Sequence, residues 1–125
     1  MTKVNFHILL ITLLMANLVQ GQTIKMKMYG MEDGLSDKVI RNIVQDKYRH
    51  LWIGTEYGLN RYDGHQFQTF LHDPTDSSSI SNNSIFGLAA DQSNHIWIGT
   101  DHGLNRYTHL QTNLSTIYIQ RTAIL

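Results

Sequence analysis

The chain has 125 residues, a length compatible with one ordinary domain, and its ten Lys and Arg residues balance ten Asp and Glu residues. A formal charge of zero excludes the broad electrostatic surface by which proteins bind nucleic acids or anionic membranes, so no nucleic-acid partner is expected. Cysteine is absent, which excludes disulfides and thiolate metal sites, and the seven histidines are scattered without close ligand spacing. We therefore expect neither a metal nor another cofactor.

The first 21 residues differ in composition from the rest of the chain. Lys3 precedes an apolar run from Ile8 to Val19, which is interrupted only by Thr12 and Asn17. Such a run is shorter than the roughly 20 apolar residues that a spanning helix needs. A buried hydrophobic helix is the alternative, but the N-terminal position favours a helical signal peptide over 1–21, with cleavage near Gly21. The mature chain is thus expected to be exported.

The most informative feature of the remaining sequence is an internal repeat. "LSDKVIRNIVQDKYRHLWIGTEYGLNRYD" (35–63) aligns without a gap to "ISNNSIFGLAADQSNHIWIGTDHGLNRYT" (80–108). A fixed period of about 45 residues is typical of repeat architectures rather than of a free-standing domain. The sequence therefore divides into a lead-in strand at 22–34, a first unit at 35–79 and a second unit at 80–125, whose C-terminal tail diverges.

Local patterns within each unit favour strands. Short apolar runs end in Asp and a polar turn, "LWIGT" and "IWIGT" are rich in β-branched and aromatic residues, and "QFQTF" alternates polar with aromatic residues. Asp63-Gly64 predicts a two-residue type I′ hairpin turn. We expect four antiparallel strands per unit, near 39–46, 51–55, 59–63 and 66–71 in the first copy. The fold class is then all-β, with two four-stranded blades of an incomplete β-propeller.

Residues that are identical in both units are expected to have structural roles. The tryptophans should fill the space between blades, the first glycine of each unit should leave room for a neighbouring backbone, and the second should take a positive φ. The arginines are expected to pair with a carboxylate such as Asp46 or Asp91, whereas these aspartates and His50 and His95 should bond the local turn backbone. The structural set is Trp52, Gly54, Gly58, Asn60, Arg61, Tyr62, Trp97, Gly99, Gly103, Asn105, Arg106 and Tyr107.

Positions that differ between the units at strand ends are the candidates for ligand contact. Glu56 and Tyr57 in the first unit correspond to Asp101 and His102 in the second, directly after "WIGT". Their carboxylate, phenol and imidazole groups would suit a sugar, although solvated turns use the same residue types. A catalytic site on His50, His95, Asp46 and Asp91 is the less favoured alternative, because catalysis needs distinct groups that converge on one substrate. No catalytic residue is therefore assigned.

The sequence "GLSDKVIRNIVQDKYRHLWIGTEYGLNRYDGHQF" resembles the repeat of the two-component regulator propeller family. The second copy departs from the pattern after Tyr107, where Thr108-His109 replaces Asp-Gly. The resemblance implies the periplasmic sensor region of a hybrid two-component histidine kinase, which perceives extracellular nutrients, often oligosaccharides, and relays the signal through a phosphorelay to transcription. An interaction scaffold without a signalling role, a non-functional truncated product and a glycan-active propeller enzyme are the alternatives.

Parts that the resemblance implies are missing from the sequence. No kinase motif follows the second repeat, so the chain itself is not expected to be an enzyme. Propellers have about 4–8 blades, and two blades would leave an apolar face and strand edges uncovered. The expected partners are therefore the remaining blades and the kinase of a longer sensor, an oligosaccharide ligand, and a second copy in a homodimer. A fragment of such a sensor is favoured over a short protein that assembles by oligomerisation.

Overall fold

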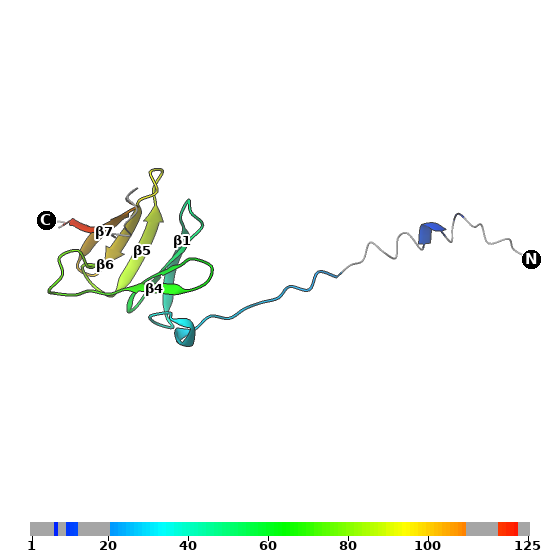
Figure 1. Ribbon diagram of the computed structural model, residues 1–125, viewed down its shortest axis with the longest axis horizontal. Coiled ribbons are helices and arrows are strands. Elements are labelled where there is room, and N and C mark those ends of the chain that lie inside the picture. The colour runs from blue at the N-terminus through cyan, green and yellow to red at the C-terminus, as the bar shows by residue number, and fades with distance from the viewer. Residues whose placement is uncertain (1–6, 8–9, 13–20, 110–117, 123–125) are drawn as a thin grey trace, which may run out of the picture.

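Eight β-strands form two separate sheets in the part of the chain that the computed structural model describes, which is residues 7, 10–12 and 21–109 and the backbone of 118–122 (Figure 1). The first sheet contains β1 (Ile40–Gln45), β2 (Leu51–Thr55), β3 (Gly58–Tyr62) and β4 (Phe67–Phe70), in that order. The second contains β5 (Ile85–Ala90), β6 (Ile96–Thr100), β7 (Gly103–Thr108) and β8 (Tyr118–Thr122). Neighbouring strands are antiparallel throughout. The expected all-β class, with one antiparallel sheet in each unit, is confirmed.

The two sheets share the same register, so the sequence repeat is also a structural repeat. Trp52 pairs with Arg61 across β2 and β3, and Trp97 pairs with Arg106 across β6 and β7. Even the irregularity is repeated, because the register shifts between Ile40 and Asn42 in one sheet and between residues 85 and 87 in the other. Equivalent residues of the two units therefore lie on equivalent faces, because side chains alternate along a strand.

The hydrophobic core lies between the two sheets, which pack face to face with β5 against β1 and β2 (Figure 1). Trp52 and Leu59 of the first sheet are completely buried against the second. Tyr107 of β7 approaches Trp52 with a ring-centroid distance of 4.5 Å. Large aromatic rings contribute most of the apolar area that such a core removes from water. The predicted inter-sheet role of Trp52 is confirmed.

Two local predictions from the sequence are wrong. Residues 22–30 form no strand, and Met31–Asp33 forms a 3₁₀ helix (η1), so the lead-in is not a strand. The predicted type I′ turn at Asp63-Gly64 is also absent. Residues 63–66 connect β3 to β4, Asp63 has a negative φ, and its Oδ1 accepts hydrogen bonds from the backbone N–H groups of His65 and Gln66. A type I′ turn needs a positive φ at both central residues, and only Gly64 (99°) provides it.

The two repeated glycine pairs have different outcomes. Gly58 and Gly103 have φ values of 122° and 137°, which confirms the predicted left-handed conformation. Gly54, in contrast, makes room for side chains of the opposite sheet rather than for backbone. A Cβ added there would lie 2.6 Å from Cγ2 of Ile85. For Gly99 the nearest atoms to such a Cβ are backbone atoms of Gly87 in its own sheet, at 3.8 Å and 3.9 Å.

Most of the predicted signal peptide lies outside the described residues. Only His7 and residues 10–12 of the first twenty are described, and they are helical. No helix among the described residues has the length and apolarity needed to cross a bilayer. The assignment of 1–21 as a signal peptide therefore stays a prediction, as do the domain boundaries.

Candidate functional site

A buried asparagine holds the segment that precedes each sheet. Asn60 is completely buried in β3, and its Oδ1 accepts the backbone N–H of Ser36 at 3.0 Å. Its Nδ2 donates to the Ser36 hydroxyl at 2.7 Å, and that hydroxyl lies 3.1 Å from the Thr55 hydroxyl. Asn105, Ser81 and Thr100 repeat these contacts in the second unit. The shared residues of "GLS", "WIGT" and "GLNRY" thus form one polar cluster per sheet.

A second polar cluster closes the opposite end of each sheet. Oδ2 of Asp46 accepts a hydrogen bond from Nε1 of Trp52 at 3.0 Å and lies 3.0 Å from Nδ1 of His50. Its Oδ1 accepts the backbone N–H groups of Tyr48 and His50. The predicted bonding of the aspartate to the local turn backbone is confirmed. Asp91, His95 and Trp97 repeat the arrangement at the same spacing.

Both aspartates are held in the ionised form. Burial raises the pKa of Asp46, but the hydrogen bonds from Trp52 and His50 outweigh burial and bring the net value below the ordinary one. The pKa of Asp91 is strongly lowered, first by the hydrogen bond from Trp97, against a smaller opposing effect of burial. A carboxylate that accepts several N–H bonds loses them on protonation, which is why its charged form is favoured.

His109 connects the second unit to the Asp46 cluster of the first. Its Nε2 lies 3.3 Å from Oδ2 of Asp46, and its ring lies 4.7 Å from the Tyr107 ring and 4.8 Å from the Tyr48 ring. Burial lowers the pKa of His109; Asp46 opposes this effect, whereas the positive charges of Arg61 and His50 add to it. His109 occupies the position where the first unit has Gly64, and sequence reasoning did not predict its contact.

Arg61 also bridges the two sheets, but its partner is not a carboxylate. Its Nη1 donates to the Tyr107 hydroxyl at 3.1 Å and its Nη2 donates to Oε1 of Gln68 at 2.7 Å. The guanidinium lies 5.7 Å from the centroid of the Trp52 ring, and Arg106 lies 5.6 Å from that of Trp97. The expected pairing of Arg61 with Asp46 or Asp91 is wrong, because the aspartates are engaged by tryptophan and histidine. An aromatic face and a phenol stabilise the cation instead.

The four candidate ligand-contact residues lie at equivalent turns. Glu56 and Tyr57 connect β2 to β3, and Asp101 and His102 connect β6 to β7, so the repeat places both pairs at the same rim of the stacked sheets. All four are exposed. Glu56 forms an exposed ion pair with Arg41 at 2.6 Å, and 55% of the Tyr57 surface is accessible. The rim therefore presents acidic, phenolic and imidazole groups to solvent.

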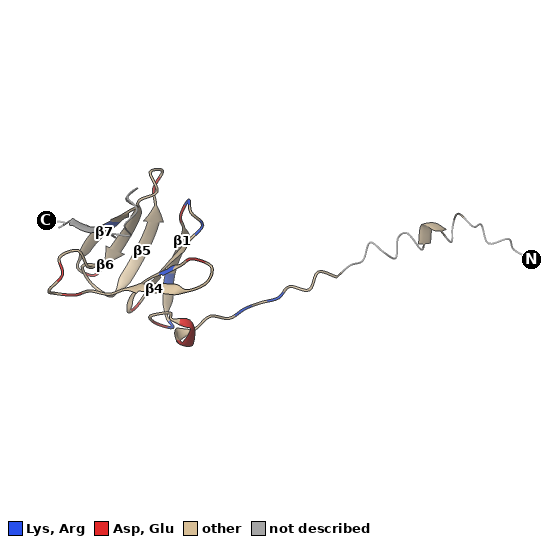
Figure 2. Ribbon diagram, viewed as in Figure 1, with Lys and Arg blue, Asp and Glu red and all other residues tan. Residues whose placement is uncertain are grey.

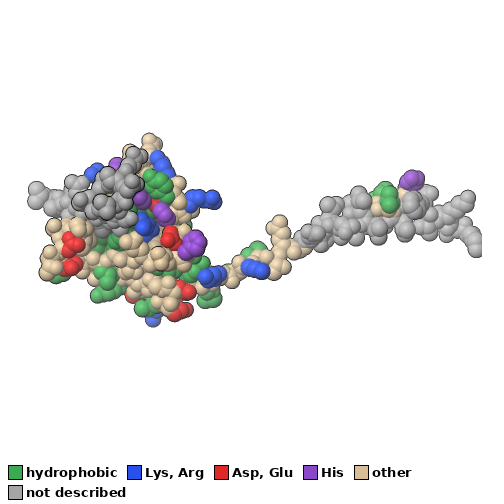
Figure 3. Space-filling view, in the orientation of Figure 1, with side chains coloured by type: hydrophobic (Ala, Val, Ile, Leu, Met, Phe, Trp, Pro, Cys, Tyr) green, Lys and Arg blue, Asp and Glu red, His purple; other side chains and the backbone are tan. Residues whose placement is uncertain are grey.

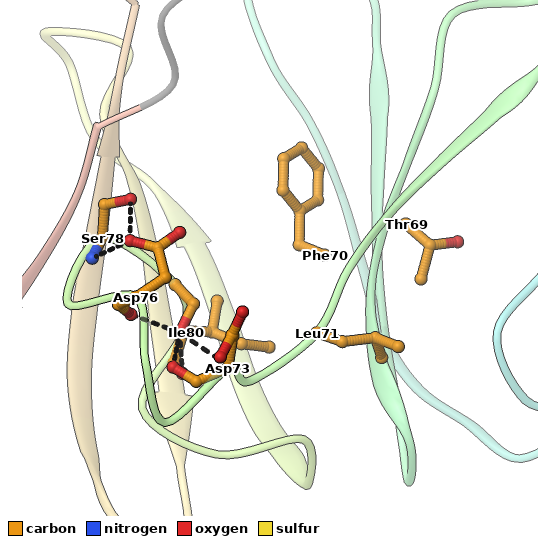
Figure 4. Close-up of a pocket in the computed structure, with 8 residues that line it drawn as sticks. Thr69, Phe70, Leu71, Asp73, Asp76, Ser78 and Ile80 are labelled. Atoms are coloured by element: carbon orange, nitrogen blue, oxygen red, sulfur yellow. Dashed lines mark hydrogen bonds between the residues drawn. The ribbon is translucent and has the colours of Figure 1, made fainter.

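A pocket of about 320 Å³ that sequence reasoning missed lies between β4 and the loop that leads to the second sheet (Figure 4). Thr69, Phe70 and Leu71 form one side, and the loop supplies Asp73 and Asp76 among other residues (Figure 4). Hydrogen bonds from Thr75 lower the pKa of Asp73. The polar sequence "DPTDSSS" does not indicate this pocket, because no sequence pattern shows that the loop folds back beside Phe70.

Charge and metal-binding groups are dispersed over the described part of the molecule. Figure 2 shows acidic and basic residues spread over separate turns and loops of the ribbon rather than gathered in one segment of a single sign. No group of three or more His, Asp or Glu side chains among the described residues is placed to hold a metal ion.

Comparisons with known proteins agree on one family. The family model described as "Two component regulator propeller" matches residues 34–57 and 79–102. Histidine kinase P4 of Formosa agariphila is 42% identical over 77 residues, which cover 61% of this chain and 6% of that protein. The chain thus spans a small part of the length of this curated relative.

Two solved structures from B. thetaiotaomicron are also similar. The extracellular domain of the hybrid two component system BT3049 is 36% identical with a TM-score of 0.59, and the match covers 65% of this chain and 12% of that one. The extracellular domain of the hybrid two component system BT4673 is 35% identical with a TM-score of 0.52, covering 58% and 10% respectively. Both the sequence and the arrangement of the strands are therefore shared with such domains.

Proposed function

We propose that this chain, which carries two repeats of the two-component regulator propeller family, is part of the ligand-sensing propeller of a hybrid sensor histidine kinase. It is homologous to a histidine kinase and to extracellular domains of hybrid two-component systems. The observation that carries this proposal is the stacking of two equivalent sheets, each with the same buried asparagine and aspartate clusters. In this proposal each sheet is one blade.

The proposal places the chain outside the cytoplasmic membrane. The apolar segment of 1–21 directs export, and the homologous domains are extracellular. The longer protein supplies further blades and the kinase. A ligand that binds one of two arrangements of the propeller more tightly shifts the population toward it, and this shift is what reaches the kinase.

We place ligand contact at the rim formed by Glu56, Tyr57, Asp101 and His102. These groups are exposed, come from turns that equivalent blades present side by side, and differ between the blades, as a surface that reads an asymmetric ligand requires. Carboxylates accept hydrogen bonds from sugar hydroxyls, and an exposed phenol ring packs against the apolar face of a sugar. An oligosaccharide is therefore the proposed ligand class.

The ligand class can be tested by measuring the thermal unfolding midpoint of the purified chain with neutral and acidic oligosaccharides and, for comparison, amino acids. Binding to the folded state alone raises the free energy of unfolding by about 2.7 kcal/mol at a ligand concentration one hundred times the Kd. Tyr57→Ala should abolish the shift. Tyr48→Ala is the matched control, because Tyr48 is equally exposed (57%) but lies on a turn at the opposite rim.

Two results would contradict the ligand proposal. One is a shift produced by amino acids and not by any oligosaccharide. The other is an oligosaccharide shift that Tyr57→Ala leaves unchanged and Tyr48→Ala removes, which would move the binding surface to the opposite rim.

A further inference from the structure

Each sheet has a β-bulge near the start of its first strand. In the first sheet the register between β1 and β2 shifts at Arg41, which has no partner on β2. In the second sheet the register between β5 and β6 shifts at Phe86, which has no partner on β6. A bulge redirects a side chain and is often found beside a binding site. Arg41 and Phe86 are therefore equivalent residues that the two sheets present in the same way.

The bulges lie at the rim that carries the proposed ligand contacts. Nη2 of Arg41 lies 2.6 Å from Oε1 of Glu56, which belongs to the turn between β2 and β3. Phe86 comes one residue after the β5 residue that pairs with Thr100, and Thr100 directly precedes Asp101 in the turn between β6 and β7. Each bulge residue thus lies beside the candidate ligand-contact turn of its own sheet.

The first of these turns also contacts the segment that leads to Phe86. The backbone N–H of Gly58 donates to the carbonyl oxygen of Asn83 at 2.7 Å, and Asn83 precedes Phe86 by three residues. Tyr57 and Phe86 therefore lie on either side of one hydrogen bond between the sheets. Because three residues of chain span at most about 10 Å, both aromatic residues can contact one ligand of several sugar units.

Neither neighbouring sheet covers the bulge position. The first sheet is packed against the second on one side, yet 41% of the Arg41 side chain stays accessible. The second sheet lies on the other side of that interface, and Phe86 is 49% exposed. The adjacent position differs, because Ile40 is exposed but its equivalent Ile85 is completely buried. Since the two bulge residues report on both sides of the contact, the position should stay accessible between further blades of the longer protein.

The apolar surface around the described sheets is divided into small areas. On the face shown in Figure 3, hydrophobic side chains lie in several small groups among polar ones rather than in one broad patch. Interfaces with other proteins commonly use larger continuous apolar patches. A single exposed aromatic ring beside polar turns therefore fits a small amphipathic ligand better than a protein partner.

The charges of the rim disfavour an acidic ligand. The segments 36–41, 56–57, 81–86 and 101–102 form this part of the rim, and acidic residues exceed basic ones in them by one. The charged residues are Asp37, Lys38, Arg41, Glu56 and Asp101. The Arg41 guanidinium is already paired with a carboxylate, so an acidic sugar would have to displace Glu56 to reach it.

We propose that Phe86 and Arg41 complete the ligand site of this rim and make it selective for neutral oligosaccharides, an inference that rests on the proposed function. The Phe86 ring packs against the apolar face of a sugar ring. The Arg41–Glu56 pair donates hydrogen bonds to sugar hydroxyls from its guanidinium and accepts them at its carboxylate. The same pair offers no free positive charge to a uronate or a sulfate.

The test measures binding of the purified chain to an array of neutral, uronic-acid-containing and sulfated glycans, and then titrates the best neutral glycan in solution. Phe86→Ala should raise the Kd about tenfold or more, because aromatic anchors carry much of the energy of a binding site. Phe86→Leu should bind as weakly, whereas Phe86→Tyr should keep most of the affinity, since only the aromatic variant retains a stacking surface. Tyr48→Ala is the matched control, because Tyr48 is similarly exposed but lies at the opposite rim.

The role of Arg41 is tested in the same titration. Arg41→Gln should raise the Kd several-fold, because it removes the guanidinium donors and leaves Glu56 unpaired. Lys25→Gln is the matched control, because it removes the same charge from an exposed position in the lead-in and should leave the Kd unchanged. Urea unfolding of each variant verifies that it is folded.

The outcomes separate this inference from the proposed function. A preference for acidic or sulfated glycans would overturn the inference alone. So would an affinity that Tyr57→Ala removes but Phe86→Ala leaves unchanged, or one that Phe86→Leu retains in full. Binding to no glycan of the array, or an affinity that only Tyr48→Ala removes, would overturn the inference together with the oligosaccharide site of the proposed function.

Discussion

At the scale of single residues, the side chains that the two repeats share act inside the fold rather than on its surface. Asn60 and Asn105 are completely buried, and each satisfies backbone groups that would otherwise lack partners. The sequence predicted a structural role for them, because equivalent positions of repeated units pack in the same way and therefore use the same residue. It could not predict that their partners would be Ser36 and Ser81, which are 24 residues away in the chain.

Asn60→Ala is expected to lower the free energy of unfolding by about 2–3 kcal/mol, because a buried backbone N–H left without an acceptor costs about 1–3 kcal/mol and the substitution also removes the bond to the Ser36 hydroxyl. Urea unfolding measures the loss. Asn105→Ala should cost a similar amount, because Asn105 makes the same two bonds to the backbone and hydroxyl of Ser81. Gln66→Ala, at an exposed position in the turn between β3 and β4, is the control for general effects of substitution in this sheet. A loss for Asn60→Ala no larger than the control's would contradict the proposed role.

At the scale of elements, equivalent strands differ according to what packs against them. β2 and β6 have almost the same sequence, yet four of the five residues of β2 are buried, whereas buried and partly exposed residues alternate along β6. The difference arises because β5 covers one face of β2. Two nearly identical strand sequences therefore contribute differently to stability, and a substitution at the same repeat position can measure the difference.

Gly54→Ala should destabilise the fold by about 1–3 kcal/mol, since a Cβ 2.6 Å from Ile85 overpacks the core. Gly99→Ala should change the free energy of unfolding by no more than about 0.5 kcal/mol, since its nearest contacts are at 3.8 Å. Both values are to be measured by urea unfolding at a dilution where the chain is monomeric. Equal losses at the two positions would show that the second sheet is covered there as well.

At the scale of the whole molecule, the burial of His109 beside the first sheet makes the stability of the two-sheet unit depend on pH. The folded-state pKa of His109 lies below 6.5, so the unfolded chain takes up this proton first as the pH falls through about 6.5. The pKa of Asp46 is also lowered on folding, so a further loss follows below about pH 4. Both shifts make the fold less stable in acid.

We expect the free energy of unfolding to fall between about pH 7 and pH 5, because protonated His109 is disfavoured by burial and by the charges of Arg61 and His50. Urea unfolding across this range measures the slope. His109→Gln should flatten it while leaving the loss below about pH 4 in place. His65→Gln is the matched control, because the side chain of His65 is 91% exposed. A slope that both variants retain would assign the dependence to other groups.

The sequence by itself determined the repeat, the four strands of each unit, the left-handed glycines and the burial of Trp52 between the sheets. These features follow from local patterns, namely residue periodicity, turn chemistry and a fixed spacing of 45 residues. Local patterns gave wrong predictions at two places. The lead-in at 22–34 was expected to be a strand and is not one, and the turn after β3 was expected to be type I′ and is not.

Only the tertiary structure decided which partner each polar or small residue meets. It placed Arg61 on Trp52 and Tyr107 rather than on a carboxylate, Ile85 rather than backbone at Gly54, His109 at Asp46, and a pocket beside Phe70. These contacts form when one sheet packs on the other, and their geometry depends on the relative placement of segments far apart in the chain. A sequence pattern records which side chains are available on a face, whereas packing decides which of them meet.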